Sequence, residues 1–139
     1  MDTACLEAYN FLMKVLIVED DKFIAEALAK KFKENNFDIG HLENGEKVVA
    51  EMITQKPDIV ILDVLLPGKD GFEILKELKK DNKTKDIPVI IVSNLGSKGD
   101  LEKAQQLGAA DFMIKATVTP ADIVEKAQKV IAEITTGNR

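Results

Sequence analysis

Polar side chains stand directly after four short apolar runs of this chain, at the points where strands would end. Glu19 and Asp20 follow "VLIV", Asp63 follows "IVIL", Ser93 follows "VIIV" and Lys115 follows "FMI". The carboxyl ends of parallel strands lie at one edge of a sheet, and that edge is the usual binding crevice of α/β proteins. We therefore expect these side chains to converge on one site.

Three carboxylates in one crevice favour the binding of a cation. Two unit charges about 4 Å apart repel by about 4 kcal/mol at an effective dielectric constant of about 20. Mg²⁺, a hard ion that takes carboxylate, water and phosphate oxygens, would offset this repulsion. Such an ion would bind a phosphoryl group together with the Lys115 ammonium and the Ser93 hydroxyl, and a carboxylate can be its nucleophile. The constellation therefore predicts phosphoryl-transfer chemistry.

Each of these residues also has a purely structural interpretation. Asp20 or Asp21 could cap the helix that follows. Asp63 could form an Asx turn, and Ser93 could bind backbone amides. Lys115 could lie along apolar surface with its ammonium in water. A suitable polar residue after every central strand favours a shared function over independent structural roles.

The elements that would position these residues alternate along the chain. Continuous apolar character predicts buried parallel strands at residues 15–18, 59–62, 89–92 and 112–114. The alternating stretch "FDIGHL" at 37–42 predicts an edge strand. Helical periodicity covers roughly residues 22–35, 45–55, 70–81, 98–107 and 120–135. Short connections between these elements predict a doubly wound α/β sheet with right-handed crossovers.

The last helix has the clearest signature. Its predicted apolar stripe consists of Ile123, Ala127, Val130, Ile131 and Ile134. Thr119, Pro120 and Asp122 supply an N-cap, a first-turn proline and a capping-box acid. We expect this helix to bury its stripe in the domain.

The composition bounds the class of protein. A length of 139 residues fits one domain, and the 45% hydrophobic and 31% charged residues are those of a globular protein. No apolar run approaches the roughly 20 residues that span a bilayer. A net charge of −5 without a basic face argues against direct nucleic-acid binding. The single cysteine, Cys5, cannot form an internal disulfide, which fits a cytoplasmic location.

The opening stretch "MDTACLEAYNFLM" precedes the first predicted strand. It carries Asp2 and Glu7 and lacks the basic start of a secretory signal, so we do not expect a cleaved leader. Two interpretations stay open. The stretch is either the product of an upstream start site or a short added helix that packs on the domain surface.

Four motifs together resemble the receiver domain of two-component response regulators. They are "LIVEDD", "LDVLLPGKDG", "PVIIVSN" and "ADFMIK", and the resemblance runs from residue 14 to about 135. It implies a flavodoxin-like, five-stranded parallel sheet of order 2-1-3-4-5 with five helices on both faces. It also implies an extension at 1–13, a receiver domain at 14–136 and a tail at 137–139.

The resemblance implies a role for each acidic residue of the site. Asp63 is similar to the phosphoacceptor, which forms a transient aspartyl phosphate. Glu19 and Asp20 resemble the acidic pair that holds Mg²⁺ with Asp63, and the backbone carbonyl of Leu65 would complete the protein ligands. The chain would thus accept a phosphoryl group from a sensor histidine kinase or a histidine phosphotransfer protein.

The resemblance also implies how phosphorylation would be read out. Lys115 would bind a phosphoryl oxygen, Ser93 would hydrogen-bond the phosphoryl group, and Phe112 matches the aromatic residue whose rotamer follows. The fourth helix, fifth strand and fifth helix, roughly residues 96–135, would form the readout face for a downstream protein target. The protein would be a monomer or a phosphorylation-dependent dimer.

The sequence departs from the family pattern at several positions. Ala116 stands where a proline with a cis bond is usual, so we expect a trans bond with a rearranged loop or a strained cis bond. Phe112 replaces the frequent tyrosine and lacks its hydroxyl. Leu65 and Leu95, two residues beyond Asp63 and Ser93, cannot orient a hydrolytic water, which predicts slow self-dephosphorylation.

Several other readings compete with a phosphoacceptor switch. One is a receiver-like interaction module without phosphorylation. A second is a small haloacid-dehalogenase-type phosphohydrolase, although Leu65 stands where its second acid would be. A nucleotide-binding flavodoxin-like protein is disfavoured because no glycine-rich phosphate loop follows the first strand. A phosphohistidine carrier is disfavoured because His41 lies in a strand or loop context.

Overall fold

Strands and helices alternate along the computed structural model of the chain, which describes residues 12–136. The strands are β1 (Met13–Val18), β2 (Phe37–Leu42), β3 (Ile59–Leu62), β4 (Val89–Ser93) and β5 (Asp111–Ile114). The α-helices are α2 (Lys22–Glu34), α3 (Val48–Gln55), α4 (Gly71–Lys80), α5 (Lys98–Gln106) and α6 (Pro120–Thr135). A short 3₁₀ helix, η1 (Lys115–Thr117), separates β5 from α6. All the predicted strands and helices are present, with small shifts at their ends.

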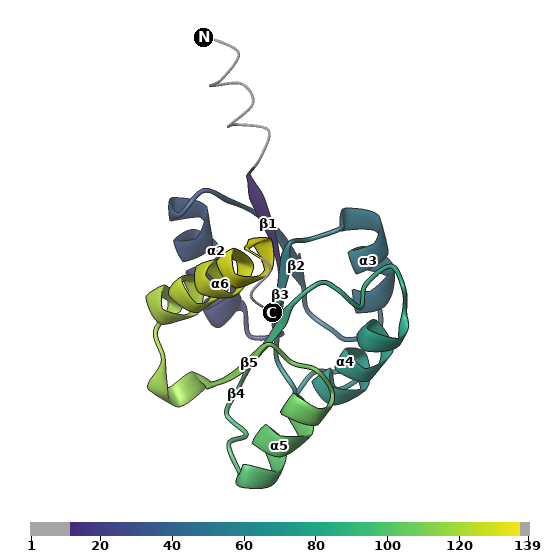
Figure 1. Ribbon diagram of the computed structural model, residues 1–139. Helices are drawn as coiled ribbons and strands as arrows, with labels where there is room; N and C mark the ends of the chain where they lie inside the picture. Colours follow the sequence, from purple (N-terminus) through teal and green to yellow (C-terminus); the bar gives the residue numbers. More distant parts are fainter. Residues whose placement is uncertain (1–11, 137–139) are drawn as a thin grey trace, which may run out of the picture.

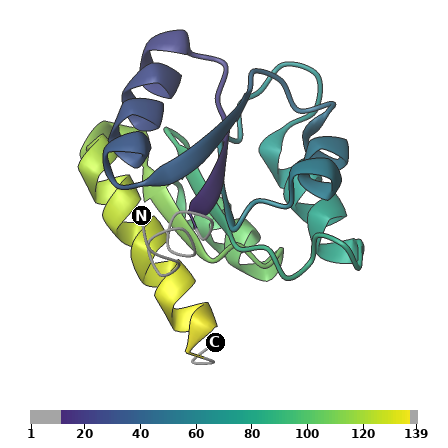
Figure 2. The same ribbon diagram turned by 90° about the horizontal axis from the view of Figure 1, so that it is seen from above.

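The strands form one parallel sheet of order β2-β1-β3-β4-β5. Helices α2 and α6 cover one face of the sheet, and α3, α4 and α5 cover the other (Figures 1 and 2). This confirms the predicted flavodoxin-like, doubly wound architecture. Because all strands run in the same direction, their carboxyl ends lie along one edge of the sheet.

The central strands are buried on both faces. All residues of β3 are buried. Val60 and Leu62 pack into a core cluster with α3 and α4, whereas Ile59 and Ile61 pack into a second cluster with α2 and α6. Strand β2 is only partly buried and lies at the edge. The apolar patterns therefore predicted the buried strands β1, β3 and β4 and the edge strand β2 correctly. The prediction of a buried strand at residues 112–114 is wrong, because β5 lies at the other edge of the sheet and is only half-buried.

Polar side chains fix where the helices begin. The Asp21 carboxylate accepts hydrogen bonds from backbone N–H groups in the first turn of α2, so Asp21 rather than Asp20 is the N-cap. Helix α6 begins at Pro120 with the predicted capping box, in which Thr119 and Asp122 bond each other's backbone N–H groups.

Two helical details differ from the prediction. Helix α3 begins at Val48 and not at residue 45, because the Gly45 N–H donates to the Pro67 carbonyl at 3.1 Å and residues 45–47 form a turn. On α6, Ile134 is 40% exposed, while Val124, outside the predicted stripe, is buried.

The described region begins just before the sheet. Met13 pairs with Phe37 in the first register position of β1 and β2, so the sheet starts one residue before the predicted boundary at 14. The predicted extension up to residue 11 and the predicted tail at 137–139 lie outside the described residues. Within residues 12–136, no helix has the length and apolar character needed to cross a membrane.

Candidate functional site

Three carboxylates meet at the carboxyl edge of the sheet, as predicted. Glu19 and Asp20 follow β1, and Asp63 follows β3. Each offers a carboxylate oxygen within 4.8 Å of the others. Backbone bonds fix this arrangement: the Glu19 N–H donates to the Leu42 carbonyl at 3.0 Å, and the Asp63 N–H donates to the Val18 carbonyl at 3.1 Å. The sheet itself therefore positions the two buried acids.

Lys115 forms ion pairs with two of these acids. Among residues 12–136, no other lysine or arginine has a recorded ion pair with them. Its Nζ lies 2.5 Å from Glu19 Oε1 and 2.6 Å from Asp63 Oδ2. The lysine side chain is 15% exposed, and Glu19 and Asp63 are 3% and 5% exposed. The structural interpretation, with this ammonium in water, is wrong. The lysine instead bridges two buried carboxylates from two different strands.

Burial and hydrogen bonding shift the pKa values of Glu19 and Lys115 in opposite directions. Burial raises the pKa of Glu19 above its ordinary value, and the hydrogen bond from Lys115 only partly offsets this rise. For Lys115, burial alone would lower the pKa, but the hydrogen bonds to Asp63 and Glu19 outweigh it and raise the pKa. The ammonium thus stays charged, and the carboxylates outnumber it. The cluster has negative charge left for a cation to neutralise.

The donor set fits a hard divalent cation. All three side chains present carboxylate oxygens, the ligands that Mg²⁺ prefers. Glu19 and Asp63 are buried, whereas Asp20 is exposed, so one side of the cluster faces solvent and water ligands. The Leu65 N–H donates to Asp63 Oδ1 at 3.3 Å, which holds the loop after β3 against the site. The predicted use of the Leu65 carbonyl as a ligand stays a prediction.

Ser93 and Phe112 lie at the predicted places, at the end of β4 and within β5. Ser93 ends β4 and is fully buried, and its Oγ accepts a hydrogen bond from the Leu95 N–H at 3.3 Å. Phe112 is half-buried in β5 and packs against the core cluster of the α3–α5 face. The recorded hydrogen bond of the Ser93 hydroxyl therefore holds the loop after β4, while those of the Asp63 carboxylate run to Lys115 and Leu65.

The loop after Lys115 has a trans peptide bond and the rearranged path that was one of the two expected outcomes. Residues 12–136 contain no cis peptide bond, so the bond between Lys115 and Ala116 is trans. Lys115, Ala116 and Thr117 form η1, and the Thr117 hydroxyl donates to the Ile114 carbonyl at 3.0 Å. Of the two expected outcomes, the trans bond with a rearranged loop is the one found.

The sequence analysis did not identify two residues that support the site, His41 and Gly71. His41 Nε2 lies 2.8 Å from the Glu19 carbonyl oxygen, so the neighbouring strand braces the acidic pair. Gly71 starts α4, and its N–H donates to the Val64 carbonyl at 2.9 Å. A side chain on Gly71 would collide with the backbone of Asp63 and Val64. No signal in the sequence marks the contact of His41, because its partner is a backbone carbonyl.

Comparisons with known proteins agree with this geometry. A family model for the response regulator receiver domain matches residues 15–128. The phosphate regulon transcriptional regulatory protein PhoB of Escherichia coli (strain K12) is 30% identical over 121 residues, which cover 87% of this chain and 52% of PhoB. The chain thus spans about half the length of the curated relatives it matches.

Solved structures of response regulators also match this chain. The receiver domain of Francisella response regulator 1452 matches with a TM-score of 0.81 and 29% identity, over 88% of this chain and 98% of that one. A DNA-binding response regulator of the LuxR family from Staphylococcus aureus matches with a TM-score of 0.79 and 30% identity, over 86% and 99% of the two chains. From its sequence and its fold, this chain belongs to the response regulator receiver domain family.

Proposed function

We propose that this domain is a Mg²⁺-dependent phosphoacceptor switch that is phosphorylated on Asp63 by a sensor histidine kinase or a histidine phosphotransfer protein. The observation that carries the proposal is the position of Asp63, buried at the end of β3 with Lys115 Nζ at 2.6 Å. Receiver domains are phosphoacceptor signalling domains as a family. The residue that accepts the group here, its metal requirement and its partners are our proposal.

The transfer uses the carboxylate as the nucleophile. An Asp63 oxygen attacks phosphorus in line, the new O–P bond forms as the bond from phosphorus to the donor breaks, and the leaving group keeps its electron pair. Glu19, Asp20 and Asp63 would hold Mg²⁺, which when bound neutralises charge on the phosphoryl oxygens. The Lys115 ammonium already lies beside the acceptor and would exchange its bond to Asp63 for one to the phosphoryl group.

The signal would then pass to the readout face, residues 96–135. A phosphoryl group adds charge and acceptor oxygens that Ser93 and Lys115 can bind only in the modified state. A Ser93 hydroxyl drawn toward that group would pull the loop that it now holds through Leu95. Phe112 would follow this movement. The output is control of a partner protein that binds this face.

Intact-mass spectrometry tests the proposal directly. The protein is incubated with Mg²⁺ and acetyl phosphate, beside Asp63→Asn, a chelator control and Asp38→Asn, which removes an exposed carboxylate from β2. We expect one phosphate-sized gain in the wild type and in Asp38→Asn, and none in the other two samples.

The outcomes separate the competing readings. No gain in a folded wild-type protein would favour the interaction module. A gain that persists in Asp63→Asn would place the acceptor elsewhere. Steady hydrolysis of a phosphate ester, beyond loss of the protein's own phosphate, would favour the phosphohydrolase.

A further inference from the structure

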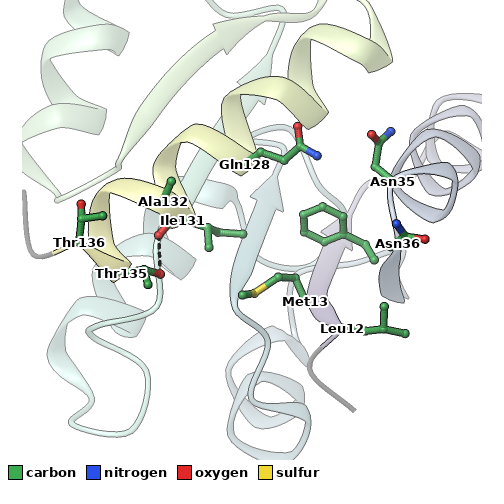
Figure 3. Close-up of a pocket in the computed structure, with 10 residues that line it drawn as sticks. Leu12, Met13, Asn35, Asn36, Gln128, Ile131, Ala132, Thr135 and Thr136 are labelled. Atoms are coloured by element: carbon green, nitrogen blue, oxygen red, sulfur yellow. Dashed lines mark hydrogen bonds between the residues drawn. The ribbon is translucent and has the colours of Figure 1, made fainter. Parts of the chain in front are cut away.

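One asparagine of the chain is followed directly by a glycine. Asn44 and Gly45 lie in the bend between β2 and α3, where Asn44 is exposed and Gly45 is buried. In such a pair, the backbone nitrogen of the glycine can attack the side-chain amide of the asparagine, because no side chain on the glycine hinders its approach. Asn35 and Asn36, at the end of α2 (Figure 3), are each followed by a residue with a side chain and lack this feature.

The side-chain amide of Asn44 is held in a form that favours this attack. Its Oδ1 accepts a hydrogen bond from the Glu46 N–H at 3.1 Å, so the side chain bridges across Gly45. The same N–H would stabilise the negative charge that develops on this oxygen when a nucleophile adds to the amide carbon. The electrophile is therefore already in place in this structure, and it is exposed to water.

The nucleophile, in contrast, is already hydrogen-bonded. The Gly45 N–H donates to the Pro67 carbonyl at 3.1 Å. Gly45 also packs so closely that a Cβ on it would collide with the Lys69 carbonyl oxygen. An amide nitrogen held in this way can neither turn toward the Asn44 side chain nor lose its proton to hydroxide. We refer to this contact, between Gly45 and residues 67–69, as the latch.

The latch involves the loop that follows the proposed acceptor. Residues 64–70 connect Asp63, at the end of β3, to α4. Within this loop, the Lys69 N–H donates to the same Pro67 carbonyl at 3.2 Å, and Lys69 Nζ forms an ion pair with Glu77 of α4 at 2.7 Å. This ion pair is partly exposed, and contacts of this kind can open locally while the core stays folded. Opening of the loop opens the latch.

We propose that Asn44 is a deamidation site whose reaction is gated by the latch. When the latch opens, the Gly45 nitrogen loses its proton to hydroxide and forms a bond to Asn44 Cγ. The bond from Cγ to the side-chain nitrogen breaks, and this nitrogen takes a proton from water and leaves as ammonia. Water then opens the cyclic imide and yields aspartate or isoaspartate at position 44.

The isoaspartate product would keep the latch open. Its main chain runs through Cβ, so the backbone between positions 44 and 45 is longer and the Gly45 N–H no longer meets the Pro67 carbonyl. The modification is thus a one-way change beside the loop that follows Asp63. It needs no phosphoryl group and does not depend on the proposed function.

Mass spectrometry tests this proposal after incubation at mildly alkaline pH in water enriched in heavy oxygen. The product incorporates heavy oxygen, and peptide mapping locates it. We expect Asn44 of the folded wild type to react measurably, but roughly tenfold or more slowly than in urea, where the latch is absent. Asn36 and Asn82, neither of which precedes a glycine, should react far more slowly than Asn44 in urea.

Pro67→Gly loosens the latch without changing the reacting pair. Because glycine makes the loop more flexible, we expect deamidation of Asn44 to become roughly threefold faster in the folded variant and to stay unchanged in urea. Asn82→Gly, which places a glycine in the exposed loop before β4, is the matched control and should react at Asn44 like the wild type. Hydrogen exchange of the Gly45 amide, followed by NMR, measures opening of the latch and should be faster in Pro67→Gly alone.

Three outcomes would overturn the proposal. Equal rates in the folded wild type and in urea would mean that the latch protects nothing. An unmodified Asn44 in the folded wild type, after the urea sample has reacted, would mean that the folded domain is not a substrate. Unchanged deamidation in folded Pro67→Gly, with or without faster hydrogen exchange at Gly45, would mean that the latch does not control the reaction.

Discussion

If Asp63 is the phosphoacceptor, as proposed, we expect the lifetime of its phosphoryl group to depend on the side chains next to the strand ends. Leu65 follows the acceptor by two residues, and its side chain is 59% exposed. Leu95 follows Ser93 by two residues and is half-buried against the core of the α3–α5 face. Neither side chain can accept or donate a hydrogen bond, so neither can orient or deprotonate an attacking water.

Polar replacements at these positions should speed hydrolysis. We expect Leu65→Asn with Leu95→Glu to lose phosphate roughly tenfold faster or more, because an amide and a carboxylate can hold the attacking water. The measurement is the decay of the phosphorylated mass after acetyl phosphate is removed. Leu101→Asn changes another exposed leucine, on α5, and should decay like the wild type. If the folded double variant keeps the wild-type lifetime, the two leucines do not control hydrolysis.

For individual residues, residue type and topology predicted the acidic cluster but not all the hydrogen bonds around it. Glu19, Asp63 and Lys115 come together because each follows a parallel strand, and both facts are visible in the sequence. The bond of His41 to the Glu19 carbonyl was missed because a backbone acceptor leaves no mark in a sequence. The bond from the Leu95 N–H to Ser93 agrees with the structural interpretation that this hydroxyl binds a backbone amide, but the choice of Leu95 depends on the path of the chain after β4.

Helix α4 begins against the backbone of Asp63, the proposed acceptor. A Cβ at Gly71 would lie 2.7 Å from Val64 Cα and even closer to the Asp63 carbonyl oxygen. Gly71→Ala should therefore lower the free energy of unfolding by about 1–3 kcal/mol, the usual cost of overpacking. It should also slow phosphorylation, because the backbone that carries Asp63 must shift.

Another helical glycine provides the control for this substitution. A Cβ at Gly99, in α5, would meet only Ser97 Oγ, at 3.8 Å. Gly99→Ala should stabilise the protein slightly, by roughly 0.5 kcal/mol, because alanine favours the helix. Urea unfolding and the rate of mass gain with acetyl phosphate measure both effects. Equal stability and equal rates for the two variants would mean that α4 does not constrain the acceptor.

Lys79 ties the end of α4 to the loop before β4. Its Nζ donates to the carbonyl oxygens of Lys85 and Ile87, each at 3.1 Å. Burial lowers the pKa of Lys79, and the nearby Asp86 only partly opposes this. As pH rises toward 10.5, the folded protein therefore loses this proton before the unfolded chain does. The unfolded state then binds more protons, so stability from this group rises with pH.

Lys79→Met keeps the apolar stem and removes both hydrogen bonds. The wild type should be more stable by about 1 kcal/mol at pH 7, since each bond contributes about that amount before the cost of burying the charge. Its advantage should grow as pH approaches 10.5, because deprotonation relieves that cost. Urea unfolding of both proteins at pH 7 and near pH 10 measures the difference. An advantage that shrinks with pH would contradict the assigned direction of the pKa shift.

Element boundaries were predicted less well than element types. Periodicity identified α3, but its start depends on Gly45, whose backbone bonds Pro67 and abuts Lys69 from a distant loop. Helical spacing also placed Ile134 in the apolar stripe of α6, but this residue is 40% exposed. For α3, the deciding contact comes from residues far away in the sequence, which local patterns do not record.

Across the described residues, the central strands are buried far more deeply than α5 and β5, two elements of the proposed readout face. Strands β1, β3 and β4 are almost wholly buried. In contrast, α5 buries only Ala104 among its residues, and all of β5 is half-buried. A cavity of about 330 Å³ between α5 and β5 is lined by residues that include Leu101, Ala104 and Phe112. A helix with so few buried residues can shift at low cost, which suits the change that we propose for this face on phosphorylation.

Ser93 is the proposed link between the acceptor and this face. Ser93→Ala should still be phosphorylated on Asp63, because the nucleophile and Lys115 remain, but the loop after β4 would lose the hydroxyl that responds to the phosphoryl group. In the wild type, we expect acetyl phosphate with Mg²⁺ to shift the amide NMR signals of residues 94–114, and in Ser93→Ala to shift them much less. Thr54→Ala, which removes an exposed hydroxyl on α3, should respond like the wild type. Unreduced shifts in phosphorylated Ser93→Ala would mean that the signal reaches α5 and β5 through Lys115 and η1 instead.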